Sequence, residues 1–153
     1  MKQLLFILLF FISFNLYSQN IYKGASTYQS NIIYNVKDGY VYKKNSKMDV
    51  DLLYYFDGKY VYKLKKSKSH YNSDIILTYK DGIIYKGSTT YESNILSRFN
   101  DNKFYLGNSL YTSDIILTYK NNKIYKGNST YNSNILLNTS EYIHPIIIFT
   151  ILL

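Results

Sequence analysis

A unit of about twenty residues recurs six times along the chain, and this recurrence limits the possible folds more than any other feature. The tyrosines that open the copies are 20, 20, 23, 20 and 20 residues apart: Tyr22, Tyr42, Tyr62, Tyr85, Tyr105 and Tyr125. Six residues later most copies carry a second tyrosine, and a short polar residue and an apolar pair follow, as in Tyr91, Asn94 and Ile95-Leu96. Three additional residues near 65–68 account for the spacing of 23. A period of this length is typical of repeat architectures, in which each unit packs on its neighbours.

Each unit has the pattern of two β-strands joined by a tight turn. The segment from Ile75 to Lys80 is β-branched and aromatic with period-two alternation, which predicts a strand. Asp81-Gly82 follows, and this pair favours a two-residue type I′ turn, because both central residues of that turn need a positive φ. The segment from Ile83 to Lys86 is the expected return strand. Six such units predict about twelve short antiparallel strands.

The strand pattern also suggests which side chains form the core. On the longer strand, we expect Ile75, Leu77 and Tyr79 to face the core and the residues between them to face away. On the shorter strands, the opening tyrosines alternate with an aliphatic or aromatic row, and either row could point inward. That row is Val41, Val61, Ile84, Phe104 and Ile124.

A single open sheet of twelve strands would expose a whole apolar face and two edges, which invite aggregation. The sequence therefore predicts an all-β antiparallel meander of about six two-strand repeats, closed into a shallow barrel or radial ring. An open, twisted meander is the alternative. A parallel β-helix is disfavoured, because the Asp-Gly turns specify antiparallel neighbours.

The two ends of the chain depart from the repeat. The segment from Leu4 to Phe14 is almost wholly apolar, follows Lys2 and precedes Ser18, which predicts a signal peptide over 1–18. The alternative, a membrane anchor, is disfavoured because the run is shorter than the roughly 20 residues that a bilayer span needs. We therefore expect an exported mature chain, periplasmic, outer-surface or secreted, without a membrane span.

The repeat domain is expected over 19–137, with units starting near 21, 41, 61, 84, 104 and 124. A hydrophobic tail follows over 138–153, in which the run from Ile146 to Leu153 has Thr150 as its only polar residue. This tail could be a closing strand, a hydrophobic plug, a membrane-surface contact or the product of a shifted reading frame.

The unit from Ile124 to Leu136, Ile-Tyr-Lys-Gly-Asn-Ser-Thr-Tyr-Asn-Ser-Asn-Ile-Leu, resembles a known repeat. It is similar to the tandem β-hairpin repeat of small exported bacterial proteins, and the resemblance covers about residues 21–137. This resemblance implies a β-flower-like ring of hairpins and carries no functional residues to this chain. A shape-level similarity also links the unit to choline-binding repeats, whose ligand cages depend on Trp, and this chain has no Trp.

The residue types present exclude much chemistry. The chain has no Cys, which removes disulfides, thiolate nucleophiles and thiolate-bound metals. Its two histidines, His70 and His144, stand in unrelated contexts, and the only glutamates are Glu92 and Glu141. The aspartates stand at turn positions of the repeat, where they have a structural reason to be. We therefore expect no enzyme, no metal site and no cofactor.

Two sets of side chains are the candidate binding sites. A basic patch with affinity for polyanions is expected from five lysines within ten residues: Lys59, Lys63, Lys65, Lys66 and Lys68. Of the 18 basic residues only Arg98 is an arginine, which argues against specific nucleic-acid recognition. The other candidate set is the row of opening tyrosines, whose rings could form a platform for sugars. Cross-strand pairing within the sheet is the structural alternative for that row.

These expectations together favour an exported, non-catalytic β-repeat protein. Its predicted role is to bind a glycan or another anionic polymer of the cell envelope or the extracellular space. A structural or self-associating protein without a small-molecule ligand is the alternative, and an enzyme is a third, weaker one. The oligomeric state stays open.

Overall fold

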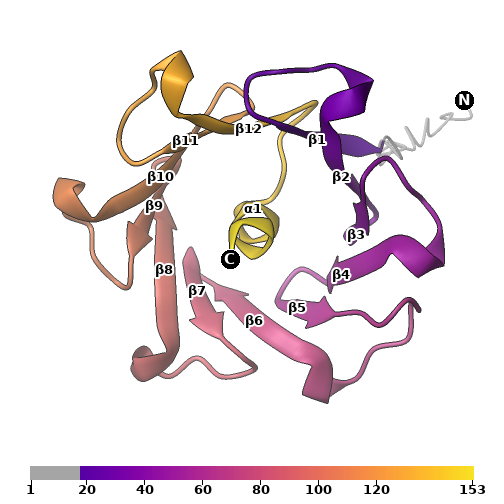
Figure 1. The fold of residues 1–153 in the computed structure, drawn as a ribbon. Coiled ribbons are helices and arrows are strands. Elements are labelled where there is room, and N and C mark those ends of the chain that lie inside the picture. The colour runs from indigo at the N-terminus through magenta and orange to yellow at the C-terminus, as the bar shows by residue number, and fades with distance from the viewer. Residues whose placement is uncertain (1–17) are drawn as a thin grey trace, which may run out of the picture.

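Twelve antiparallel strands form one closed ring in the structure, a computed structural model that describes residues 18–153. The strands are β1 (Gln19–Lys23), β2 (Ile32–Lys37), β3 (Tyr40–Lys43), β4 (Leu52–Phe56), β5 (Tyr60–Lys63), β6 (Ile75–Lys80), β7 (Ile83–Lys86), β8 (Ile95–Asn100), β9 (Lys103–Leu106), β10 (Ile115–Lys120), β11 (Lys123–Lys126) and β12 (Ile135–Thr139). Consecutive strands pair, and β1 pairs with β12, so the two ends of the repeat array close the ring (Figure 1). The predicted closed meander is confirmed. The predicted leader, apart from Ser18, lies outside the described residues.

The tight turns adopt the conformation that their residues favour. Asp81-Gly82 and Asn121-Asn122 both have two consecutive residues with positive φ, as a type I′ turn requires. Asp38-Gly39 and Asp101-Asn102 do the same. The β4–β5 turn differs: Asp57 Oδ1 accepts from the amides of Lys59 and Tyr60. The residue types at the tight turns therefore determine five of the hairpins.

A β-bulge at the apolar pair changes the predicted core face. Val61 pairs with Leu77 and Tyr62 pairs with Ile75, so Ile76 is an extra residue in its strand. Leu77 and Tyr79 face the main core as predicted, and Ile76 packs there too. The prediction for Ile75 is wrong, because the bulge moves it to the outer face beside Tyr62.

All six units carry this bulge at the second residue of the apolar pair. The bulged residues are Ile33, Leu53, Ile76, Leu96, Ile116 and Leu136. Each of their carbonyls accepts a hydrogen bond of 2.8–3.0 Å from the amide two residues after an opening tyrosine, as Ile76 O does from Gly87 N. Because a bulge increases local twist, its repetition helps twelve short strands to close into a ring.

The structure decides which row of the short strands points inward. The aliphatic or aromatic row is 0–1 % exposed and forms the core, with Ile21 as its sixth member. The opening tyrosines point to the outer face of the sheet, yet they are also buried, with 4–9 % of their surface exposed. They pack against the first residue of each apolar pair, as Tyr42 does on Leu52.

The loops between hairpins contain short 3-10 helices, which the sequence did not predict. They are η1 (Gln29–Asn31), η2 (Asp49–Asp51), η3 (Asn72–Asp74), η4 (Glu92–Asn94), η5 (Thr112–Asp114) and η6 (Asn132–Asn134). Figure 1 shows these helices at the outer edge of the ring, like the tips of petals.

The hydrophobic tail forms helix α1 (Pro145–Leu152), which lies in the middle of the ring (Figure 1). Pro145 occupies the first turn, where its missing N–H and fixed φ are tolerated. Ile146 and Ile148 are fully buried in the main core. The Thr150 hydroxyl donates to Ile146 O at 2.6 Å, so the one polar side chain of the helix is satisfied. The tail therefore occupies the position of a plug.

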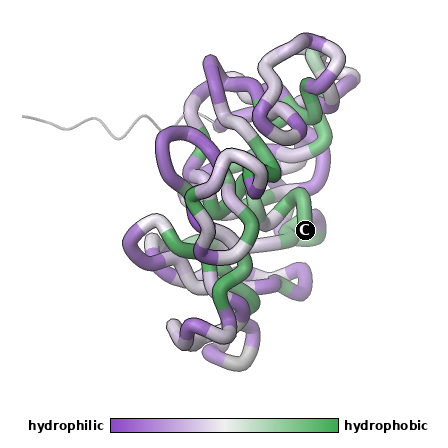
Figure 2. Tube along the Cα trace, turned by 90° about the vertical axis from the view of Figure 1, so that its left-hand side faces the viewer, coloured by the Kyte–Doolittle hydropathy of each residue, from purple (hydrophilic) through white to green (hydrophobic). Residues whose placement is uncertain are grey.

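The ring has two mouths, at opposite ends of α1. At the turn mouth, where the tight turns lie, His144 packs against Phe56 and Tyr79. At the other mouth, which we call the lysine mouth, Phe149 and Leu153 lie beside Ile116. Figure 2 shows hydrophobic segments inside the ring and hydrophilic loops around it. None of the helices within residues 18–153 is long and apolar enough to cross a membrane.

Candidate functional site

The predicted tyrosine platform is part of the packed sheet. Because the opening tyrosines keep less than a tenth of their surface exposed, they present narrow edges to solvent. Tyr62 has the most constrained hydroxyl, which donates to Asp57 Oδ2 at 3.0 Å. Burial and this bond to a carboxylate raise the pKa of Tyr62 to about 12. The row therefore contributes cross-strand packing between units, the role that the sequence left open as the structural alternative.

The five lysines of the predicted basic patch lie at different places in the ring. Lys59 lies in the β4–β5 turn with its Nζ 4.6 Å from the centre of the Tyr60 ring, at the opposite end of β5 from Lys63. Lys65 and Lys66 lie beyond Lys63 and line a hollow with Lys43. Lys68 is held in the insertion, where its Nζ is 3.7 Å from Asp49 Oδ1. Lys63, Lys65 and Lys66 are therefore near one mouth, and the other two are apart from them.

The insertion of the third unit builds an aromatic cluster on the outer face. His70 packs on Tyr62, with 4.4 Å between ring centres, and on Tyr55, with 4.9 Å. Tyr55 in turn stacks on Tyr40 at 4.4 Å. Lys68 lies 5.5 Å from the Tyr40 ring, close enough for a cation–π contact. This cluster gives His70 a packing role and breaks the six-fold symmetry.

Six strongly exposed large side chains form a second repeating set, which we call the rim. It consists of the residue before each 3-10 helix: Tyr28, Met48, Tyr71, Tyr91, Tyr111 and Tyr131. These side chains are 64–78 % exposed. They stand at the petal tips, so the ring presents six equivalent positions around its outer edge.

The backbone that carries the rim is held by hydrogen bonds repeated in every unit. The carbonyl of each rim residue accepts a hydrogen bond of 2.9–3.0 Å from the amide three residues later, as Tyr91 O does from Asn94 N. In four units the short polar side chain also bonds a hydroxyl five residues earlier, as Asp51 does with Ser46 at 2.6 Å. In the third unit the short polar side chain bonds the backbone instead, since Asp74 Oδ2 accepts from the amide of Tyr71 at 3.1 Å.

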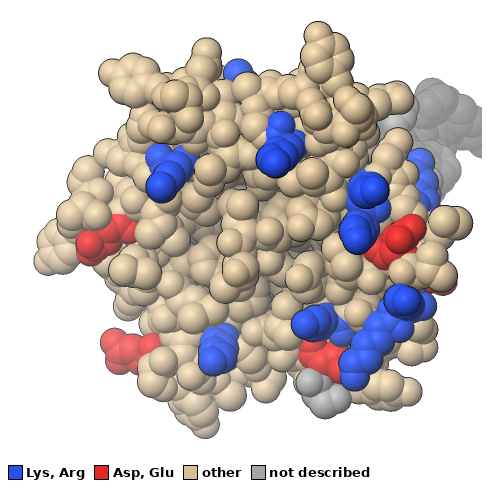
Figure 3. All heavy atoms as spheres, viewed as in Figure 1, with Lys and Arg blue, Asp and Glu red and all other residues tan. Residues whose placement is uncertain are grey.

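The second candidate surface is the lysine mouth. The residue after the opening tyrosine is an exposed lysine in five of the six units and the exposed Leu106 in the other. These lysines are Lys23, Lys43, Lys63, Lys86 and Lys126. Figure 3 shows basic side chains distributed around this face, with acidic side chains toward the edge and neither kind in the middle.

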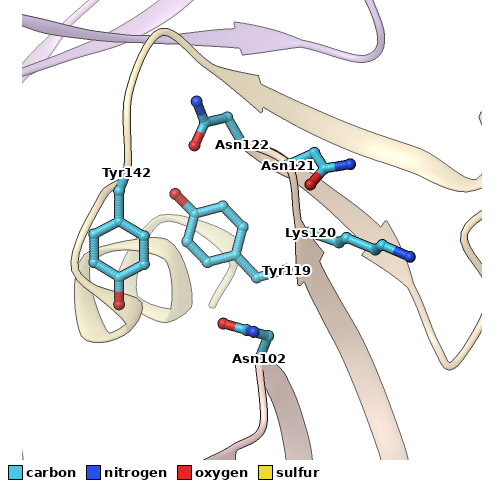
Figure 4. A pocket seen from close by; sticks show the side chains of 6 residues that line it. All are labelled: Asn102, Tyr119, Lys120, Asn121, Asn122 and Tyr142. Atoms are coloured by element: carbon cyan, nitrogen blue, oxygen red, sulfur yellow. The ribbon is translucent and has the colours of Figure 1, made fainter.

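The turn mouth contains a polar pocket, shown in Figure 4. Tyr119 and Tyr142 stack there with 5.4 Å between ring centres, and Asn102 and Asn122 lie beside them. The Tyr119 hydroxyl accepts from Ile143 N at 2.8 Å, so it anchors the chain that enters α1. The pocket lining contains no carboxylate and no histidine. Among residues 18–153, no group of three His, Cys, Asp or Glu side chains could hold a metal ion.

The sequence contains signals for both exposed sets, which are also markers of the repeat. The rim tyrosines stand between Ser/Thr residues and a short polar residue, outside any alternating strand pattern. Such a position is typical of an exposed loop. The sequence shows a lysine after five of the six opening tyrosines, but only closure of the ring brings these five lysines to one mouth.

Comparison with known proteins agrees with this architecture. The family model of the 6-fold beta flower protein matches residues 21–151, which include all six units and nearly all of α1. No curated protein and no solved structure matches the chain. The β-flower resemblance inferred from the repeat is confirmed, and a match over more than half of the chain assigns the family. This chain belongs to the 6-fold beta flower protein family.

Proposed function

We propose that the chain is an exported, non-catalytic binding protein whose rim holds a repetitive glycan of the cell envelope or the extracellular space. The observation that carries this proposal is the set of six exposed rim side chains, five of them tyrosines, at equivalent positions. Side chains that are 64–78 % exposed contribute little to the core, so they are available to contact a ligand.

The chemistry of the rim suits a sugar. A tyrosine ring offers an apolar face and a hydroxyl on one rigid side chain, and it loses little conformational entropy on binding. The same loops carry hydroxyl, amide or carboxylate side chains, as Thr89 and Asn94 do in the loop of Tyr91. Because hydrogen bonds already hold each tip, binding would not have to order the loop first.

Six equivalent tips favour a ligand that itself repeats. Contacts that are individually weak gain strength when several bind the same polymer, since each later contact is intramolecular. A small monomeric sugar would use one tip and bind weakly. Strong binding of the polymer with weak binding of the monomer therefore distinguishes polymer binding from recognition of a single sugar unit.

The test is co-sedimentation with insoluble polysaccharides, including peptidoglycan sacculi, using three adjacent regular units. The triple variant Tyr91→Ser, Tyr111→Ser and Tyr131→Ser should lose about tenfold or more in affinity with an unchanged melting temperature. The matched control is Tyr142→Ser, which removes an exposed tyrosine outside the rim. Unchanged binding by the triple variant, or an equal loss in the control, contradicts the proposal.

The same exposed side chains favour a second candidate, self-association through the rim. Apolar groups at the edge of a ring can also pair with those of another copy. Light scattering over a range of protein concentrations distinguishes the two. Oligomers that form without ligand and disappear in the triple rim variant support self-association.

A further inference from the structure

The lysine mouth combines a ring of positive charge with an apolar centre. The five lysines pair in register with residues that face the ring interior, as Lys86 does with Leu77 and Lys126 with Leu117. Side chains directly opposite each other in an antiparallel pair share a face, so these lysines border the interior. Lys44, Lys65 and Lys66, which are exposed in the adjoining loops, add charge beside Lys43 and Lys63.

The acidic side chains lie elsewhere. Of the ten, four are in or beside the tight turns of the opposite mouth, five are in the 3-10 helices, and Glu141 precedes α1. Asp51 comes to the edge of the lysine mouth, where it lines a hollow with Lys43, Lys65 and Lys66. The ion pair found among the described residues joins Lys68 to Asp49 and involves no lysine of the mouth. The lysine mouth therefore carries a net positive charge, with Asp51 at its edge.

The centre of the mouth is apolar. A shallow pocket of about 240 Å³ lies there, lined by Ile116, Leu117, Leu136, Phe149, Leu152 and Leu153. Leu153 is 74 % exposed, and Leu106, which replaces the lysine in the fifth unit, is 62 % exposed. In Figure 1 the end of α1 lies at the centre of this face, and Figure 2 places it toward one side of the ring.

We propose that the lysine mouth docks on a membrane surface that contains anionic lipids, with the lysines on the headgroups and the apolar centre against the acyl boundary. Lysine suits this arrangement, because its long stem can lie along apolar surface while the ammonium reaches a phosphate. Interfacial binding of this kind increases with both buried apolar area and attraction to anionic headgroups. The mouth supplies both.

Two other occupants fit the mouth less well. A soluble polyanion would bind the lysines and leave the leucines in water. A second copy of the chain would bring two rings of like charge together, which is unfavourable. A lipid surface matches the charge and the apolar centre at once. This inference is independent of the rim, which uses different side chains.

The first experiment is co-sedimentation of the full chain with vesicles of phosphatidylcholine, with and without phosphatidylglycerol. The triple variant Lys23→Gln, Lys86→Gln and Lys126→Gln should weaken binding to the anionic vesicles about a hundredfold. The matched control changes three exposed lysines at the turn mouth, Lys59→Gln, Lys80→Gln and Lys120→Gln, with the same change in net charge. This control should bind nearly as the natural chain does.

A second variant tests the apolar centre. Leu153→Glu should weaken vesicle binding, whereas Leu110→Glu, at a leucine that is 54 % exposed in a loop between hairpins, should not. Four results would overturn the proposal: no binding to anionic vesicles, equal binding to neutral ones, equal losses in the two lysine triples, or full binding by Leu153→Glu. Binding to a soluble polyanion such as heparin without vesicle binding would also overturn it and assign the mouth to a polymer.

Discussion

The two mouths of the ring are built from the same six units, yet they carry different chemistry. At the turn mouth, Asp and Asn serve the tight turns, and hydrogen bonds such as Ile143 N to Tyr119 Oη tie α1 to the sheet. At the lysine mouth, that end of the hairpin is held by backbone bonds and by threonine hydroxyls, as Thr118 Oγ1 donates to Gly127 O at 2.7 Å. The lysine after the opening tyrosine takes no part in those bonds. The contrast teaches that the fold uses the turn side chains at one mouth and leaves the lysine side chains available at the other.

The largest expected effect on the free energy of unfolding distinguishes the two ends of α1. Ile146 is fully buried near the turn mouth, so Ile146→Ala should lower the free energy of unfolding by about 2–5 kcal/mol. Leu153 is exposed at the lysine mouth, so Leu153→Ala should change it by less than about 0.5 kcal/mol. Urea denaturation followed by circular dichroism measures both. Similar losses in the two variants would show that the ends of α1 are equally embedded.

Alanine substitutions of glycines at the two mouths should differ in their loss of stability by a smaller amount. A Cβ on Gly82 would lie 2.8 Å from Phe99 O, whose residue also donates its amide to Gly82 O at 2.7 Å. A Cβ on Gly87 would meet nothing within 4 Å, although its φ of +70° is left-handed. Gly87→Ala should therefore cost about 1–2 kcal/mol, from backbone strain alone.

Gly82→Ala should destabilise the fold more than Gly87→Ala does, because the carbonyl of Phe99 must move as well. Gly82→Asn provides the comparison, since Asn102 and Asn122 occupy the same slot with φ of 59° and 58°. We expect the asparagine variant to be the milder of the two Gly82 substitutions. Thermal unfolding of the three variants gives the order, and a Gly87→Ala loss equal to that of Gly82→Ala would refute it.

The smallest effect concerns pH and involves the turn mouth alone. Burial between Phe56 and Tyr79 lowers the pKa of His144, because desolvation disfavours the imidazolium. The unfolded chain then binds the proton more readily than the folded chain, so stability is full above the unfolded pKa, about 6.5, and falls as pH drops below it.

His144→Asn should remove this pH dependence and keep a polar side chain before α1, while His70→Gln should retain it. Melting temperatures between pH 8 and pH 5 measure the difference. Parallel pH profiles for the natural chain and His144→Asn would show that His144 is not the group responsible.

The repeat made much of the fold predictable. The predicted strands from Ile75 to Lys80 and from Ile83 to Lys86 coincide with β6 and β7, since alternation and an Asp-Gly turn are local signals. Closure followed from the exposed edges that an open sheet would leave. The bulge was not predicted, because an extra residue in a strand becomes visible only in the register against the partner strand.

Helix α1, in contrast, could not be predicted from its local sequence. Its isoleucine-rich sequence is β-branched, which is unfavourable for a helix and suggests a strand. The ring offers no free strand edge once β1 pairs with β12, so the tail can satisfy its backbone only within itself. Burial in the ring then outweighs the local preference.

The sequence alone determined the number of units, the hairpin in each and the chemistry of the turns, because these depend on contacts within about ten residues. The tertiary structure alone decided which tyrosine of each unit is buried, which lysines share a mouth and where the tail lies. These depend on closure, which joins β1 to β12 across the whole chain. The repeated unit therefore specified the strands and turns, and closure of the ring specified which of their side chains remain exposed.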